Sequence, residues 1–148
     1  MDRELVVKGL IRGTATFLTM SLAPLLLTRI IRDLRPGLEV FANIRIVAAI
    51  GSLIAVFLSI REIKREENLG FVAGILGTML SMLYVIILFS GPTGLGFVRI
   101  SYDKVTLALN LRKYVFLLLI SLSIGALIEL TELIKSLRLK RNGDVTSK

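Results

Sequence analysis

The sequence predicts an all-α membrane protein, a four-helix transmembrane bundle with an extracytoplasmic β-hairpin between helices 3 and 4. Three observations support this prediction. Of the 148 residues, 54% are hydrophobic, which would leave a soluble domain with much apolar surface in water. Four apolar stretches approach or exceed the length needed to cross about 30 Å of hydrocarbon. One loop alternates between apolar and polar residues, as a β-hairpin does.

The four helices are expected at about residues 10–32, 40–62, 70–90 and 113–137 of a single domain that covers residues 1–138. Pro24 lies inside the first helix and should kink it, which helices in lipid tolerate better than soluble ones. The third stretch, from Gly70 to Ser90, has no charged residue and is the most uniform. The fourth is interrupted late by Glu129 and Glu132.

The Lys and Arg residues predict the orientation of these helices. Eleven lie in the flanks that share a side with the two termini, and eight lie on the opposite side. The positive-inside rule then places both termini in the cytoplasm of a multi-pass cell-membrane protein. The tail, residues 139–148, has no apolar pattern and is expected to be a disordered cytoplasmic segment.

The net charge of +8 could suggest binding to nucleic acid. The cationic residues do not form a stripe, however, but sit in clusters between long apolar runs, as expected at membrane interfaces. The expected partner of this charge is therefore the lipid bilayer, with its anionic headgroups, and no nucleic-acid partner is expected.

The loop between the third and fourth helices predicts the hairpin, at about residues 96–111. It opens with a turn signal, Gly91 to Gly96, that contains three glycines and a proline. Apolar and polar residues then alternate on both sides of Asp103-Lys104, which indicates two amphipathic strands joined by a polar turn. The alternative is that residues 106–111 begin the fourth helix early.

Small residues on one face of the third helix predict close helix packing: Gly70, Gly74, Gly77 and Ser81. Small residues allow two helix backbones to approach within a membrane, where van der Waals contact replaces hydrophobic collapse. The face could pack inside one bundle or join two protomers, and the first interpretation is favoured because a four-helix bundle already needs such a face.

Arginines gather at the outer ends of the first two helices: Arg29, Arg32, Arg35 and Arg45. Arginine presents a planar fork to phosphate, so the group is a candidate site for an anion or a lipid headgroup. The favoured alternative is that each side chain extends separately to the headgroup region, with local pairing to Asp33 or Glu39.

Glu129 and Glu132 are three residues apart and share a face of the fourth helix, near its cytoplasmic end. A carboxylate within a membrane is a candidate proton carrier or cation ligand. The favoured alternative is a salt bridge from this pair to Arg12 of the first helix or to Lys135.

The composition excludes several kinds of chemistry. The chain has no cysteine and no histidine, so thiolate nucleophiles, Ser-His pairs and the usual zinc sites are excluded. No phosphate loop or dinucleotide-binding fingerprint is present. We therefore expect no catalytic residues, no cofactor and no metal.

Two functions fit these features. The first is a non-catalytic accessory or scaffold subunit of a membrane complex. Its expected partners are other membrane subunits or further copies of itself. The second is a small oligomeric transporter or channel component that uses Glu129 and Glu132, or the outer arginines, to handle an ion or solute. The first is favoured because no charged residue lies at the bilayer midplane, where transport sites usually lie.

Overall fold

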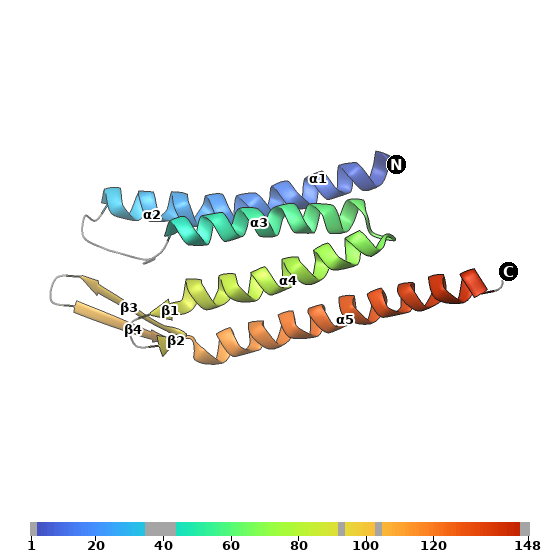
Figure 1. Ribbon diagram of the computed structural model, residues 1–148. Coiled ribbons are helices and arrows are strands. Elements are labelled where there is room, and N and C mark those ends of the chain that lie inside the picture. The colour runs from blue at the N-terminus through green and yellow to red at the C-terminus, as the bar shows by residue number, and fades with distance from the viewer. Residues whose placement is uncertain (1–2, 35–43, 92–93, 103–104, 146–148) are drawn as a thin grey trace.

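The computed structural model of the protein describes residues 3–34, 44–91, 94–102 and 105–145 (Figure 1). Its helices are α1 (Arg3–Phe17), the short π-helix η1 (Leu18–Leu22), α2 (Ala23–Leu34), α3 (Ile44–Ile63), α4 (Asn68–Phe89) and α5 (Arg112–Val145). Its strands are β1 (Ser90–Gly91), β2 (Gly94–Leu95), β3 (Phe97–Tyr102) and β4 (Val105–Asn110). The fold is therefore mostly helical, with strands confined to the connection between α4 and α5.

Four helical segments of the described chain are long and apolar enough to cross a membrane, which confirms the predicted number. They cover Arg3–Asp33, Ile44–Ile63, Asn68–Phe89 and Arg112–Leu139. The first consists of α1, η1 and α2, which follow one another without a break. The arrangement is compatible with a multi-pass membrane protein.

The four segments pack as an open row, each against the next along the chain (Figure 1). Extensive contacts join α1 with α3, α3 with α4, and α4 with α5, whereas no comparable contact joins α1 with α5 among the described residues. Along the helix axes, both chain ends lie at one end of the bundle, which we call the terminal end, and the hairpin lies at the other (Figure 1). Consequently α5 has one helical neighbour, and most of its apolar side chains are exposed.

The centre of the protein lies where α3, α4 and η1 meet. Val47, Ile50 and Ile54 of α3 form a buried cluster with Tyr84 of α4, and Met20 of η1 packs against it. Burial is greatest on α3 because α3 lies between the first segment and α4 and so contacts helices on two sides.

The first segment changes its helical register just before Pro24. In η1 the backbone N–H of Ala23 donates to the carbonyl of Leu18, five residues back, as in a π-helix. Pro24 has no N–H and cannot bond to the carbonyl of Met20, four residues before it. The predicted disturbance at Pro24 is therefore present as a π-helical turn, and the Met20 carbonyl has no donor at position 24, where an α-helix would supply one.

The connection between α4 and α5 contains the predicted hairpin as two short strands, which form no larger sheet among the described residues. β3 and β4 pair antiparallel, from Phe97 opposite Asn110 to Tyr102 opposite Val105. The alternative of an early fourth helix is contradicted, because α5 begins at Arg112. Gly96 joins β2 to β3 at φ +78°, and a Cβ atom there would lie 2.7 Å from the Cα of Arg112, so only glycine fits this turn.

The C-terminal helix α5 continues to Val145, into the segment over residues 139–148 for which the sequence predicts disorder. Residues 146–148 lie outside the described chain, and disorder of the segment stays a prediction. The run Leu139-Lys140-Arg141 consists of good helix formers, and a helix already formed adds residues at little cost. The absence of an apolar pattern therefore marks the end of the apolar segment and not the end of the helix.

Candidate functional site

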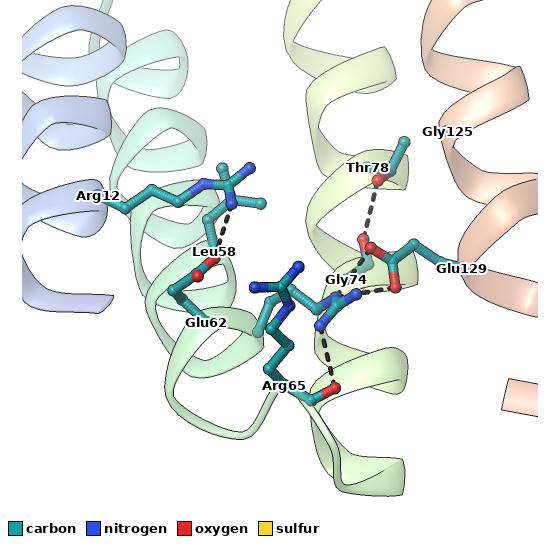
Figure 2. Close-up of a pocket in the computed structure, with 9 residues that line it drawn as sticks. Arg12, Leu58, Glu62, Arg65, Gly74, Thr78, Gly125 and Glu129 are labelled. Atoms are coloured by element: carbon teal, nitrogen blue, oxygen red, sulfur yellow. Dashed lines mark hydrogen bonds and ion pairs between the residues drawn. The ribbon is translucent and has the colours of Figure 1, made fainter. Parts of the chain in front are cut away.

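A charged pocket lies between the helices, toward the end of the bundle at which both termini lie (Figure 1 and Figure 2). Its volume is about 410 Å³, and all four helical segments contribute to its wall. The lining residues are Arg12 of α1, Leu58, Arg61 and Glu62 of α3, Arg65 of the following turn, Gly74 and Thr78 of α4, and Gly125 and Glu129 of α5. Most of the charged side chains that link different helices meet here.

The main link is an ion pair between α3 and α5. The Nε–H of Arg61 donates to both carboxylate oxygens of Glu129, at 2.8 Å each, and the side chains are 14% and 20% exposed. Glu132 adds a longer contact, 3.7 Å from Nη2 of Arg61. Because both charges are largely removed from water, each depends on the other to offset its desolvation.

The Arg61 guanidinium is also held from other directions. Its Nη1 donates to the backbone carbonyl of Arg65 at 3.2 Å, and the group lies 5.1 Å from the centroid of the Phe71 ring, within the range of a cation–π contact. These contacts fix the guanidinium in one place, so Arg61 acts as a rigid part of the wall.

Gly74 makes room for this pair. A Cβ atom on Gly74 would lie 2.8 Å from Cδ of Glu129 and 2.9 Å from Cδ of Arg61. The glycine of α4 therefore lets the two side chains meet across the helix that separates α3 from α5. The small residue and the ion pair together hold three neighbouring helices at one level.

A second ion pair joins α1 to α3 at the same pocket. Nη1 of Arg12 donates to Oε2 of Glu62 at 2.8 Å, and the side chains are 57% and 16% exposed. Figure 2 shows this pair on the α1 side of the pocket and Glu129 on the α5 side. Because Arg12 is mostly exposed, its pair is worth less than that of Arg61.

Arg65 differs from the other two arginines of the pocket. Its side chain is exposed and points into the pocket (Figure 2), and no carboxylate of the described residues lies within ion-pair distance of it. The pocket thus contains three arginines against two glutamates, and Arg65 carries the charge that is not compensated by a pair.

A second cavity of about 720 Å³ lies next to the pocket and shares Arg61 and Arg65 with it. Its other lining residues are Leu5, Glu66, Phe71, Glu132, Lys135, Ser136 and Leu139. Leu5 of α1 and Leu139 of α5 both contribute to this wall, where the row of helices is open. This cavity is more apolar in its lining residues than the first.

The structure gives the predicted glutamates a different partner. The sequence favours a salt bridge from Glu129 and Glu132 to Arg12 or Lys135, whereas the carboxylate of Glu129 binds Arg61 and Arg12 binds Glu62. The reason is the open row, which places α3 and α4 between α1 and α5. Within the described residues, no group of three or more acidic side chains could hold a metal ion.

The outer arginines lie away from this pocket. The side chains of Arg29 and Arg32 of α2 and of Arg45 of α3 are exposed. The end of α2 and the start of α3 lie at the same end of the helices as the hairpin (Figure 1). No ion pair joins them to Asp33 in the part of the chain that the structure describes. Arg35 and Glu39 lie outside the described residues, so whether the four arginines form one site stays a prediction.

The predicted packing face of α4 is buried within the chain. Gly70, Gly74, Gly77 and Ser81 are all buried. A Cβ on Gly70 would collide with the backbone carbonyl of Lys64, and one on Gly77 would lie 3.4 Å from Leu58. Ser81 donates to the carbonyl of Gly77 at 2.8 Å. The face therefore packs against α3 and the turn that follows it.

A second group of polar side chains lies at the centre of the row and contains no charge. The Ser21 hydroxyl donates to the carbonyl of Ala48 at 2.8 Å and lies 3.0 Å from the hydroxyl of Ser52. The hydroxyl of Tyr84 donates to the carbonyl of Met20 at 2.9 Å. Tyr84 thus supplies the donor that Pro24 lacks.

Gly51 allows these central contacts to form. A Cβ atom there would lie 2.5 Å from the carbonyl oxygen of Met20, so the backbone of α3 touches the backbone of η1. We refer to Ser21, Ser52, Tyr84 and the Met20 carbonyl, packed over Gly51, as the central cluster.

Three features of these sites were not predicted from the sequence. In the sequence Arg61 is one of several positive residues at the end of an apolar stretch, and Tyr84 is one aromatic residue among many apolar ones. Gly9 and Gly13 of α1 are buried against Ser59 of α3, and their four-residue spacing is a packing signal that the sequence does contain. The pairing of Arg61 with Glu129 and that of Tyr84 with the Met20 carbonyl had no such local signal.

No family model, no curated protein and no solved structure matches the chain. Function is therefore inferred from the residues and their geometry alone.

Proposed function

We propose that the protein is a non-catalytic accessory or scaffold subunit of a membrane complex, with both termini in the cytoplasm and the hairpin outside. The open row of helices carries this proposal. Among the described helices α4 alone makes extensive contact with α5, apart from the ion pairs of Glu129 and Glu132 with Arg61 of α3, and most of the apolar side chains of α5 are exposed. A transmembrane helix of a partner subunit could pack on α5 without any rearrangement of the other helices.

The use of the polar side chains also supports a structural role. Arg12, Glu62, Arg61 and Glu129 form links between helices, and the hydroxyls of Ser21 and Tyr84 do the same. No buried side-chain nitrogen or oxygen of the described residues lacks a hydrogen-bond partner. These groups are engaged in holding the row together.

The second candidate function, ion or solute handling through Glu129, has weaker support. A carboxylate that carries protons or cations must be able to exchange its partner. Glu129 instead accepts two hydrogen bonds from an arginine that is itself held by further contacts. This geometry favours a fixed structural link.

The subunit proposal is tested by photo-crosslinking in native membranes. A photoreactive side chain is placed at Leu127 of α5, which is 60% exposed, and a control is placed at Val56 of α3, which is 54% exposed. We expect one dominant protein adduct from position 127 and lipid adducts from position 56. Equal adducts from both positions, or lipid adducts alone, would contradict the proposal.

The orientation is tested separately with single cysteines, because the chain has none of its own. Ala108 of β4 and Arg138 of α5 are both exposed. In intact cells we expect a membrane-impermeant maleimide to label the Ala108→Cys variant, and to label Arg138→Cys only after the membrane is permeabilised. The reverse result would invert the proposed topology.

A further inference from the structure

Arg65 lines both the pocket and the neighbouring cavity. In the pocket every other charged side chain is paired: Arg12 with Glu62, and Arg61 with Glu129. Arg65 has no such carboxylate among the described residues and points into the space between them (Figure 2). The pocket therefore presents one free guanidinium in a wall of fixed charges.

We propose that the pocket and the neighbouring cavity together bind the phosphate headgroup of an anionic phospholipid, with Arg65 as the residue that contacts the phosphate. A guanidinium has a planar fork of donors that matches two phosphate oxygens. Arg12, which gives one donor nitrogen to Glu62 and remains mostly exposed, adds further donors on the α1 side of the pocket.

The size and the lining of the site fit a lipid. A volume of about 410 Å³ is within the range of small-molecule sites, and the neighbouring cavity of about 720 Å³ extends it. The second cavity adds the apolar side chains of Leu5, Phe71 and Leu139, which suit a glycerol backbone and the start of an acyl chain. A free phosphate ion would make no use of these side chains.

The position along the helices also favours a lipid. The site lies at the end of the row, at the level where the apolar spans finish and headgroups begin. The helices at its two sides expose apolar residues, including Leu10 of α1 and Leu139 of α5, and Leu139 itself lines the second cavity. A lipid can therefore enter sideways from the bilayer, through the gap left by the open row.

The remaining charges of the second cavity limit the ligand. Glu66 and Glu132 line this cavity together with Lys135, and Glu132 also lies 3.7 Å from Arg61. Two carboxylates would repel a ligand with several negative charges. The site therefore suits a single phosphodiester, as in phosphatidylglycerol, better than a polyphosphate headgroup.

The experiment uses the full chain, purified in mild detergent and measured by native mass spectrometry with added lipid. We expect phosphatidylglycerol to bind more tightly than phosphatidylcholine. The Arg65→Gln variant should lose roughly tenfold in affinity for phosphatidylglycerol, since a hydrogen bond to a charged group contributes about 1.4 kcal/mol or more. The matched control is Arg138→Gln, which removes an exposed arginine that lines neither cavity.

The variant is expected to fold, because the Arg65 side chain is exposed and its contact with Arg61 uses the backbone carbonyl. An unchanged melting temperature of Arg65→Gln checks this. Equal loss of lipid in Arg65→Gln and Arg138→Gln would overturn the proposal by showing a general effect of charge. Displacement of the lipid by inorganic phosphate at equal concentration would overturn it in favour of a free-anion site.

Discussion

The central cluster and the charged pocket both hold neighbouring helices together, but they do so with different chemistry. In the central cluster neutral hydroxyls donate to backbone carbonyls, at Ala48 and Met20. In the charged pocket the links are ion pairs, Arg61 with Glu129 and Arg12 with Glu62. Each group packs over a glycine, Gly51 in the first and Gly74 in the second.

The difference follows the polarity of the surroundings. At the centre of an apolar row a hydroxyl can satisfy a carbonyl at modest cost, whereas a charge would be expensive to hold. Toward the ends of the apolar segments, where a bilayer would give way to headgroups and water, paired arginines and glutamates are tolerated. The comparison predicts larger effects from breaking one ion pair than from removing one hydroxyl.

The largest effect is expected from Glu129→Leu. It leaves the Arg61 guanidinium, 14% exposed, with only the longer contact to Glu132 at 3.7 Å, and removing one partner of a buried ion pair costs about 3 kcal/mol. The free energy of unfolding, measured by SDS titration in mixed micelles, should fall by that amount. The double variant Arg61→Met/Glu129→Leu should recover most of the loss, and a double variant as unstable as the single one would contradict the desolvation argument.

Gly51→Ala should cost about 2 kcal/mol, as overpacking of a close contact does. The new Cβ would lie 2.5 Å from the Met20 carbonyl oxygen, and this oxygen belongs to the backbone and cannot move aside alone. Gly125→Ala is the matched control in α5, because its Cβ would have only Thr78 nearby, at 4.0 Å. Equal thermal stability of the two variants in detergent would show that α3 and η1 are not in such close contact.

Tyr84→Phe should cost about 1 kcal/mol, because it removes the donor to the Met20 carbonyl and leaves that group without a partner. The effect should shrink in a Pro24→Ala background, since alanine restores the backbone N–H that Pro24 lacks. A double-mutant cycle on melting temperature measures this coupling. Additive effects of the two substitutions would mean that Tyr84 does not compensate for Pro24.

Ser52→Ala should have the smallest effect, about 0.6 kcal/mol. Ser21 keeps its bond to the Ala48 carbonyl when the Ser52 hydroxyl is removed, because both hydroxyls donate to the same oxygen. Ser21→Ala should cost more, since Ser21 supplies the bond between η1 and α3. The order of the two unfolding free energies checks this assignment, and the reverse order would contradict it.

Much of the fold could be predicted from local patterns. The apolar runs indicate the four spans, and the alternation after Gly96 indicates both strands of the hairpin, although only the structure excludes an early α5. The small residues of α4 could be grouped on one face because their spacing is helical. The extent of α5 could not be predicted from hydropathy, because loss of hydrophobicity does not by itself stop a helix, and α5 continues through Asn142 and Gly143, residues of low helix propensity.

The candidate site was harder to predict for a physical reason. Glu129 and Arg12 were both recognisable as charges near the ends of spans, but the sequence has no signal for which helices are neighbours. The open row separates α1 from α5 and gives Glu129 the arginine that faces it across Gly74. Arg65 can likewise be recognised as the pocket arginine without an ion pair only after the partners of Arg12 and Arg61 are known.

By itself the sequence determined the four apolar helical segments, the paired strands and the kinds of polar groups that the spans contain, because these depend on local periodicity and composition. The tertiary structure alone decided which polar groups meet. Gly51 and Gly74 allow the close approaches between helices. These approaches bring the Tyr84 hydroxyl to the Met20 carbonyl and the Arg61 guanidinium to the Glu129 carboxylate. Long-range pairing of this kind depends on the rotation and order of the helices, which local patterns do not encode.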